Sequence, residues 1–140
     1  MKLDRNGHLW AASGWDGIYK LSDEIILDHF NTENSNIPIN YTQQMEFAND
    51  GSVWFVHAQG GVSRYANGEI EDMTKYLKIP SSTSVNDIAF DNEDNIWLAT
   101  SRGLGMFKND SLTIFDMSDG LIRPEGNADV NVDKEGKKIR

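Results

Sequence analysis

Short alternating and apolar runs, separated by turn residues, follow one another along the chain. In the clearest stretch, residues 85–90 alternate between apolar and polar, and residues 96–100 form a short apolar run. Residues 104–107 and 112–115 follow across two polar turns. Alternation and short apolar runs bounded by Asp, Asn and Gly are typical of β-strands. The pattern therefore predicts four short antiparallel strands in this part of the chain.

The same unit occurs several times. Trp10, Trp54 and Trp97 recur at intervals of about 43 residues, and a partial copy, DVNVDKEGKKI, has Ile139 where the Trp would stand. A period of this length with strand-like units is typical of propeller blades. We therefore expect an all-β fold: a β-propeller fragment of about three four-stranded antiparallel blades plus the start of a fourth. The expected repeats of this single domain are 1–40, 41–83, 84–126 and an incomplete 127–140.

The repeated Trp residues are expected in the core. Each is followed by two apolar residues, so the second strand of each unit is apolar on both faces, as in strands that are buried on both sides. Blades pack face to face, and a Trp ring buries a large area between them. The alternative is that these rings are exposed and stack on sugars.

The turn before each Trp allows two interpretations. In FDNEDNIWLAT, Asp91, Glu93 and Asn95 alternate like the first ligands of a calcium loop, but the Gly of that motif is missing. In the other copies the place of Asp94 is taken by Gly7, Gly51 and, in the partial copy, Gly136. Such residues tolerate the positive φ of a tight hairpin turn. A turn is therefore favoured over a bound cation.

Charge and composition exclude several partners. The chain has a formal net charge of -9, no Cys, and 39% hydrophobic residues, enough for a core. Nucleic acids and anionic membrane surfaces require clustered Lys and Arg. No apolar run reaches membrane-spanning length, and the chain carries no targeting signal. We expect no nucleic-acid partner and no membrane contact in this segment.

No catalytic motif stands out. His8, His29 and His57 share no spacing of a metal cluster. His57 ends the second strand of its unit, where the other units have Ser13 and Thr100. A hydrogen-bonded framework His is favoured there over a catalytic one. We expect no catalytic centre, no metal site and no cofactor.

A binding site is expected on loops at one end of the blades. In propellers, ligands usually meet the loops between the second and third strands and those leading into the innermost strands. Here Trp15, Asp16, Gln59 and Arg102 lie in the loops of the first kind and offer a stacking surface and polar groups suited to a sugar. In the alternative, Trp15 folds over the blade end and Arg102 pairs with a nearby carboxylate.

The repeat resembles a known family. The residues that carry the resemblance in the first copy are Asp4, Gly7, Leu9, Trp10, Gly14, Gly17, Ile18 and Tyr19. Together they are similar to the two-component regulator propeller repeat, and the later copies match likewise. The second copy departs from the pattern because Ala48 stands where the others have Asp. Streptogramin B lyases carry similar repeats.

The resemblance implies a function and a setting. Propellers of this family belong to the sensory region of bacterial hybrid two-component systems, outside the cytoplasm, and are thought to detect glycans. We therefore expect a non-catalytic ligand-sensing or interaction module, periplasmic or extracellular, with a carbohydrate or other small molecule as ligand. The alternatives are a lyase of the streptogramin type and a purely structural segment. Three blades do not close a ring of about 4–8. The remaining blades are expected from a longer chain, or from self-association through open edges.

Overall fold

The computed structural model describes residues 1–58 and 61–115, and these residues form twelve β-strands. The strands are β1 (Lys2–Leu3), β2 (Leu9–Ala12), β3 (Ile18–Ser22), β4 (Ile25–Phe30), β5 (Thr42–Phe47), β6 (Val53–His57), β7 (Val62–Ala66), β8 (Glu69–Asp72), β9 (Val85–Phe90), β10 (Ile96–Thr100), β11 (Gly103–Lys108) and β12 (Ser111–Phe115).

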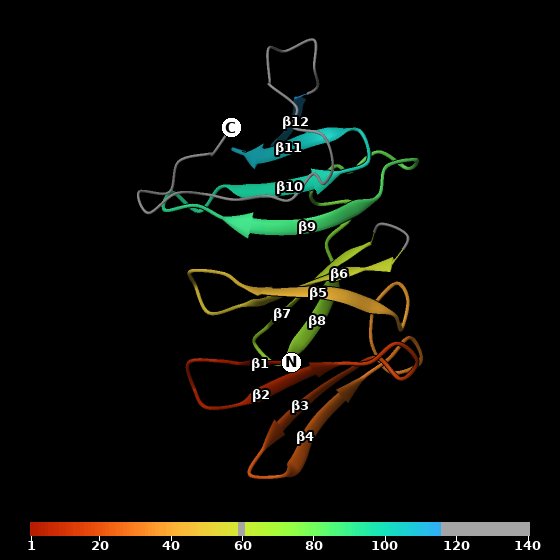
Figure 1. The fold of residues 1–140 in the computed structure, drawn as a ribbon, viewed down its shortest axis with the longest axis vertical. Helices are drawn as coiled ribbons and strands as arrows, with labels where there is room; N and C mark the ends of the chain where they lie inside the picture. Colours follow the sequence, from red (N-terminus) through yellow and green to blue (C-terminus); the bar gives the residue numbers. More distant parts are fainter. Residues whose placement is uncertain (59–60, 116–140) are drawn as a thin grey trace.

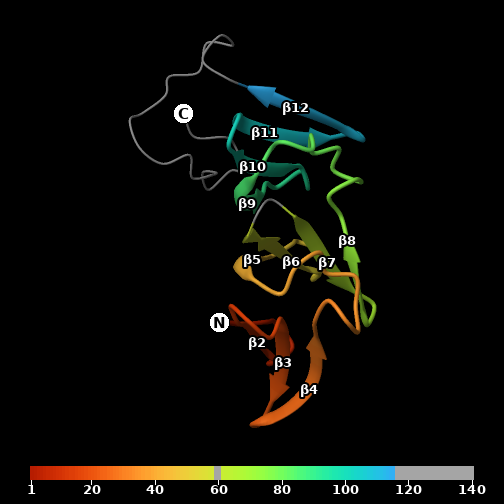
Figure 2. The same cartoon turned by 90° about the vertical axis from the view of Figure 1, so that its right-hand side faces the viewer.

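The strands form three four-stranded antiparallel sheets, which we name sheet A (β1–β4), sheet B (β5–β8) and sheet C (β9–β12). Within each sheet the strands follow one another in chain order. The sheets are stacked along the long axis of the molecule (Figure 1), and their first strands lie towards the same side (Figure 2). The predicted fold class is confirmed for these three blades. The expected fourth copy lies outside the described residues.

The three repeated Trp residues occupy equivalent places. Trp10, Trp54 and Trp97 are each the second residue of the second strand of their sheet. All three are buried, with between 1% and 7% of their surface exposed. The prediction that they belong to the core is therefore confirmed.

Each of the first two Trp rings packs against the next sheet. The Trp10 ring lies 4.7 Å from the Tyr65 ring and 5.8 Å from the Phe55 ring, both in sheet B. The Trp54 ring lies 5.5 Å from the Phe90 ring in sheet C. Each ring also has a cation above it, because the residue paired with the Trp on the third strand is Lys20 in sheet A and Arg64 in sheet B. Two hydrophobic clusters consequently join A to B and B to C.

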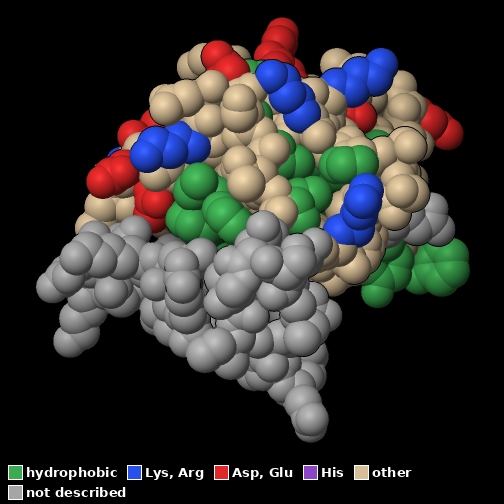
Figure 3. All heavy atoms as spheres, turned by 90° about the horizontal axis from the view of Figure 1, so that it is seen from above, with side chains coloured by type: hydrophobic (Ala, Val, Ile, Leu, Met, Phe, Trp, Pro, Cys, Tyr) green, Lys and Arg blue, Asp and Glu red, His purple; other side chains and the backbone are tan. Residues whose placement is uncertain are grey.

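A third cluster lies on the side of sheet C that faces away from sheet B. It contains buried Trp97 and Ala99 with half-buried neighbours on β9, β11 and β12. Figure 3 views the molecule from this side and shows hydrophobic side chains near its centre, with a Lys or Arg side chain directly beside them. Apolar residues thus lie on both faces of sheet C, as its sequence predicted.

In sheets A and C the turn before the Trp is held by an Asp carboxylate that also accepts a hydrogen bond from the indole. Asp4 Oδ2 accepts a hydrogen bond from Trp10 Nε1 at 2.9 Å, and Asp91 Oδ2 accepts one from Trp97 Nε1 at 2.9 Å. The φ angles of Gly7, Gly51 and Asp94 are 82°, 89° and 63°. These residues therefore form hairpin turns with positive φ, as predicted, while Gly136 lies outside the described residues. The carboxylate oxygens of Asp91 accept from nitrogen donors of its own turn and from the Trp97 indole.

Successive turns of this kind are linked across the sheets. Arg5 Nη2 donates to the Asn49 carbonyl at 3.3 Å, and Asn49 Nδ2 donates to the Asp91 carbonyl and to Asp94 Oδ1, both at 2.9 Å. These bonds connect the β1–β2, β5–β6 and β9–β10 turns at one end of the stack. The loops between the second and third strands, and the connectors between sheets, lie at the opposite end.

Candidate functional site

The loops of the opposite end form the rim on which a ligand site was expected. An antiparallel meander places the β2–β3, β6–β7 and β10–β11 loops at the same end as the β4–β5 and β8–β9 connectors (Figure 1). Backbone hydrogen bonds fix the two kinds of loop to each other. Ala58 N donates to the Tyr41 carbonyl at 3.1 Å, and Ser101 N donates to the Ser84 carbonyl at 2.9 Å. The rim is therefore formed by loops and connectors that are hydrogen-bonded to each other where the strands end.

Trp15 and Asp16 lie on the β2–β3 loop. The side chain of Trp15 is the most exposed large aromatic of the described chain, with 87% of the residue surface accessible. Asp16 N donates to Ser13 Oγ at 2.8 Å, and the Tyr19 hydroxyl lies 3.5 Å from Asp16 Oδ2. Tyr19 itself stacks on His29 with ring centroids 4.1 Å apart. The loop is thus held in place while Trp15 projects into solvent, rather than folding over the blade end.

Arg102 lies on the β10–β11 loop and is exposed. Its backbone N donates to Thr100 Oγ1 at 3.1 Å. Within residues 1–58 and 61–115 its guanidinium forms no ion pair, so the alternative in which it pairs with a carboxylate is not seen there. Gln59 lies outside the described residues. Trp15, Asp16 and Arg102 share one end of the molecule, but within the described residues no hydrogen bond or ion pair joins the first two to the third.

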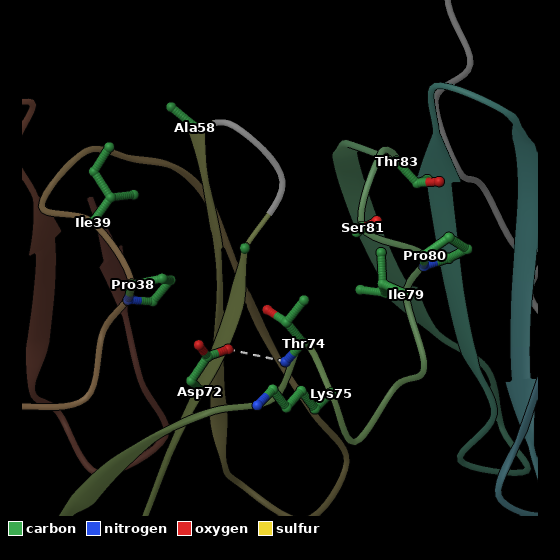
Figure 4. A pocket seen from close by; sticks show the side chains of 11 residues that line it. Pro38, Ile39, Ala58, Asp72, Thr74, Lys75, Ile79, Pro80, Ser81 and Thr83 are labelled. Atoms are coloured by element: carbon green, nitrogen blue, oxygen red, sulfur yellow. Dashed lines mark hydrogen bonds between the residues drawn. The ribbon is translucent and has the colours of Figure 1, made fainter.

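A pocket of about 350 Å³ lies on this rim. Its residues come from the β4–β5 connector, the β6–β7 loop, the end of β8 and the β8–β9 connector. They are Pro38, Ile39, Ala58, Gly61, Asp72, Thr74, Lys75, Ile79, Pro80, Ser81 and Thr83. Figure 4 shows Pro38 and Ile39 on one side, and Ile79, Pro80 and Ser81 on the other. Its volume is in the range of small-molecule sites.

The pocket combines apolar walls with charged and hydroxyl groups. Asp72 Oδ1 accepts from Thr74 N at 3.0 Å, and Lys75 runs along the same side of the pocket (Figure 4). Thr74 Oγ1 accepts from Val62 N at 3.1 Å, so this hydroxyl is partly engaged in the sheet. The hydroxyl of Thr83 is buried and has no partner among the described residues. The Pro and Ile side chains can pack on a ligand while Asp72, Lys75 and Ser81 offer polar contacts.

His57 lies inside sheet B rather than on the rim surface. Its Nδ1 is 3.0 Å from Thr42 Oγ1 and its Nε2 is 2.6 Å from Ser63 Oγ. His57 is fully buried. Burial lowers the pKa of His57 to about 4, against the opposing effects of the Tyr41 carbonyl and the Asp72 carboxylate. The imidazole therefore joins three neighbouring strands as a neutral hydrogen-bonding group, which agrees with the framework interpretation.

The pocket residues were not named from the sequence, although the connectors into the innermost strands were expected to contribute. A signal was present in the two Ile-Pro pairs, Ile37-Pro38 and Ile79-Pro80, which stand at similar distances before β5 and β9. In both pairs the Ile is buried in a cluster between sheets. The Pro that follows lines the pocket. Each connector is therefore anchored by its Ile, and the Pro is placed at the rim.

Residues 79–102 match the two component regulator propeller family. The match includes one wall of the pocket, strands β9 and β10, and Arg102. No curated protein matches the chain significantly. Within the described residues no helix is long and apolar enough to cross a membrane.

Two solved structures show the same arrangement of strands. One is the extracellular domain of BT3049 from B. thetaiotaomicron, a protein assigned to a hybrid two component system, with 24% identity, a TM-score of 0.73 and coverage of 96% of this chain. The other is a catalytically inactive virginiamycin B lyase from Staphylococcus aureus with quinupristin, with 18% identity, a TM-score of 0.64 and 92% coverage.

The chain spans 19% of the BT3049 domain and 43% of the lyase. Identities at this level show the fold. The family match places one two-component regulator propeller repeat at residues 79–102, and the solved structures show that the described sheets have the fold of propeller blades.

Proposed function

We propose that the chain is part of a non-catalytic, ligand-sensing propeller in a two-component regulatory system. The observation that carries the proposal is the overlap between the family match and the pocket. Residues 79–102 match the regulator propeller. Within that stretch, one side of the rim pocket is lined by Ile79, Pro80, Ser81 and Thr83. A repeat typical of sensors therefore contributes directly to a small-molecule-sized pocket.

The proposed ligand is a glycan or a similar hydroxyl-rich small molecule. Sugar rings have apolar faces and polar edges. Pro38 and Ile79 can pack on the apolar faces. The polar edges can form hydrogen bonds with Asp72, Lys75 and Ser81. Trp15, Asp16, Gln59 and Arg102 are proposed as further contacts for a longer oligosaccharide along the rim. Lys75 and Arg102 would favour acidic sugars.

The proposed setting is extracellular or periplasmic. BT3049, which shares the fold, is described through its extracellular domain. Because this chain spans a small part of that domain, the remaining blades are proposed to come from a longer chain. The completed propeller would then transmit the signal that the ligand is bound.

Titration of neutral and acidic oligosaccharides, followed by Trp fluorescence, tests ligand binding. The wild type is expected to respond, and Trp15→Phe and Arg102→Gln are expected to respond more weakly. Arg5→Gln is the matched control, because Arg5 lies in a turn at the opposite end and is exposed. Equal responses in Arg102→Gln and Arg5→Gln would remove Arg102 from the site. Absence of any response in the wild type would count against a glycan.

A lyase of the streptogramin type is the second candidate, because virginiamycin B lyase shares the fold. The test is incubation with Mg²⁺ and a cyclic depsipeptide lactone. The buried position of His57, between Thr42 and Ser63, predicts no turnover that depends on this residue. Turnover that is abolished in a folded His57→Ala variant would overturn the non-catalytic proposal.

A further inference from the structure

Tyr41 immediately precedes β5, the first strand of sheet B, on the rim that carries the pocket. Its backbone is fixed, because its carbonyl accepts a hydrogen bond from Ala58 N at 3.1 Å. The residue nevertheless has 50% of its surface exposed. The ring lies beside sheet A: Tyr41 Cε2 is 3.7 Å from the point where a Cβ would stand at Gly14, in the β2–β3 loop. A half-exposed aromatic ring therefore bridges the rim loops of two neighbouring sheets.

The next repeat shows that this position does not need an aromatic ring. Ser84 precedes β9 as Tyr41 precedes β5. The Ser84 carbonyl accepts a hydrogen bond from Ser101 N at 2.9 Å, which is the equivalent of the bond from Ala58 N to the Tyr41 carbonyl. The backbone is thus held in the same way by a residue with a small side chain in sheet C. The architecture of the repeat accounts for the backbone bond, and the ring of Tyr41 is additional to it.

Tyr41 also adjoins the rim pocket. Ile39, two residues before Tyr41, and Ala58, its hydrogen-bond partner, both line the pocket. Figure 4 shows these two residues on the side opposite to Ile79 and Pro80, which belong to the β8–β9 connector. A ligand that fills the pocket and extends on the side of Ile39 and Ala58 would therefore meet Tyr41.

We propose that Tyr41 forms a second subsite, on which one sugar unit stacks while the neighbouring unit of the same ligand occupies the pocket. A tyrosine ring offers a large, rigid contact surface at a small cost in conformational entropy, because only two side-chain torsions are fixed. The apolar face of a sugar can pack on this ring, and the polar hydroxyl of the ring stays at its edge. This inference rests on the proposed glycan function and specifies the ligand as an oligosaccharide rather than a single sugar.

Two adjoining subsites predict that affinity depends on the length of the ligand. A monosaccharide would use the pocket alone, whereas an oligosaccharide would place one unit in the pocket and the next unit on Tyr41. Because the two units are covalently linked, the second contact adds to affinity without a second loss of translational freedom. The contribution of the Tyr41 ring should therefore appear only with ligands of two or more units.

Amide NMR titrations of the 140-residue chain with matched pairs of sugars test the second subsite. The probes are xylose and xylotetraose, glucose and cellotetraose, and galacturonic acid and tetragalacturonate. The shifts of Thr74 and Ser81, which line the pocket, give the dissociation constants. At least one tetramer is expected to bind about tenfold more tightly than its monomer, and this ratio should fall to about twofold or less in Tyr41→Ser. Tyr41→Phe, which keeps the ring, should retain the ratio.

The substitution and its control both follow from the structure. Tyr41→Ser should fold, because Ser84 already occupies the equivalent place before β9. Tyr76→Ser is the matched control: Tyr76 is 51% exposed, but its ring packs on Phe107 at 5.2 Å and does not line the pocket. The control should keep the ratio of the wild type, because a general loss of stability would weaken the binding of monomer and tetramer alike.

A wild type that binds monomers and tetramers equally well, or an unchanged ratio in Tyr41→Ser, would overturn the second subsite and leave the pocket as a ligand site. Equal losses for monomer and tetramer in Tyr41→Ser would mean that Tyr41 only positions the connector, which would also overturn the subsite. If none of the six sugars binds to the wild type, the proposed glycan function itself fails and the subsite fails with it.

Discussion

Asp91 Oδ2 accepts a hydrogen bond from Trp97 Nε1 at 2.9 Å, and this bond ties the turn of sheet C to its repeated Trp. The same carboxyl group accepts from Glu93 N and Asn95 N at 2.9 and 3.0 Å. Burial is the largest single influence on this carboxyl and opposes ionisation. The hydrogen bonds from Trp97, Asn95 and Glu93 together outweigh burial and hold the pKa of Asp91 below its ordinary value.

Substitution of Asp91 by Ala is expected to lower the free energy of unfolding by about 3 kcal/mol, because several buried donors lose a charged acceptor. Urea unfolding measures the change. Glu93→Ala is the control: Glu93 is exposed and lies in the same turn. A loss no larger than that of the control would contradict the anchoring role.

In sheet B the Trp indole also has a hydrogen-bond acceptor, but from a different residue type. Ala48 stands at the Asp position, and Trp54 Nε1 donates instead to Ser52 Oγ at 3.0 Å. Ser52 Oγ in turn donates to Asp50 Oδ1 at 2.6 Å. The indole therefore keeps an acceptor, and the departure of the second copy from the repeat pattern is compensated within its own turn.

The two interface Trp residues should differ in their contributions to stability. Trp54 lies in the larger of the two clusters between sheets, and sheet B has a neighbour on each face. We expect Trp54→Ala to lower the free energy of unfolding by about 3–5 kcal/mol, and Trp10→Ala to cost less. Denaturant titration of both variants measures the order. An equal or reversed order would show that sheet A depends on its interface as strongly as sheet C does.

The strands and the core were predictable because their periodicity is local. Residues 85–90 and 96–100 were predicted as strands and coincide with β9 and β10. The pocket was not predicted, because it depends on contacts between segments that the sequence separates. The role of Ser52 was also not predicted, although its partners Asp50 and Trp54 belong to the same turn. Ile79, for example, is buried in the cluster that joins sheets B and C, and the Pro80 that follows it lines the pocket.

The stability of the chain should depend on pH through His57. The folded-state pKa of about 4 lies below the ordinary value of 6.5, so folding favours the neutral imidazole. This stabilisation is fully present above the imidazole pKa of the unfolded chain, 6.5, and is lost as the pH falls from 6.5 towards 4. It amounts to about 3 kcal/mol. Urea unfolding at pH 7 and pH 4 should show this additional loss in the wild type but not in His57→Gln. Parallel losses in the two proteins would assign the acid sensitivity to carboxylates instead.

Two Thr residues of the pocket should respond in opposite directions to the same substitution. Thr83→Val removes a buried hydroxyl that has no partner among the described residues, so stability should rise by about 1 kcal/mol. Thr74→Val removes the acceptor of Val62 N and should lower stability by about 1 kcal/mol. Thermal and urea unfolding measure both changes. A loss in Thr83→Val would mean that its hydroxyl has a partner in the folded protein.

Amide NMR shifts during oligosaccharide titration test the central claim most directly. If the rim pocket is the ligand site, the shifts should concentrate at Thr74, Ser81 and Thr83, which line it. The amides of Gly7 and Gly51, in the turns at the opposite end, should not move. Shifts gathered at those two turns, or no shift with any neutral or acidic oligosaccharide, would contradict a glycan-sensing site on this rim.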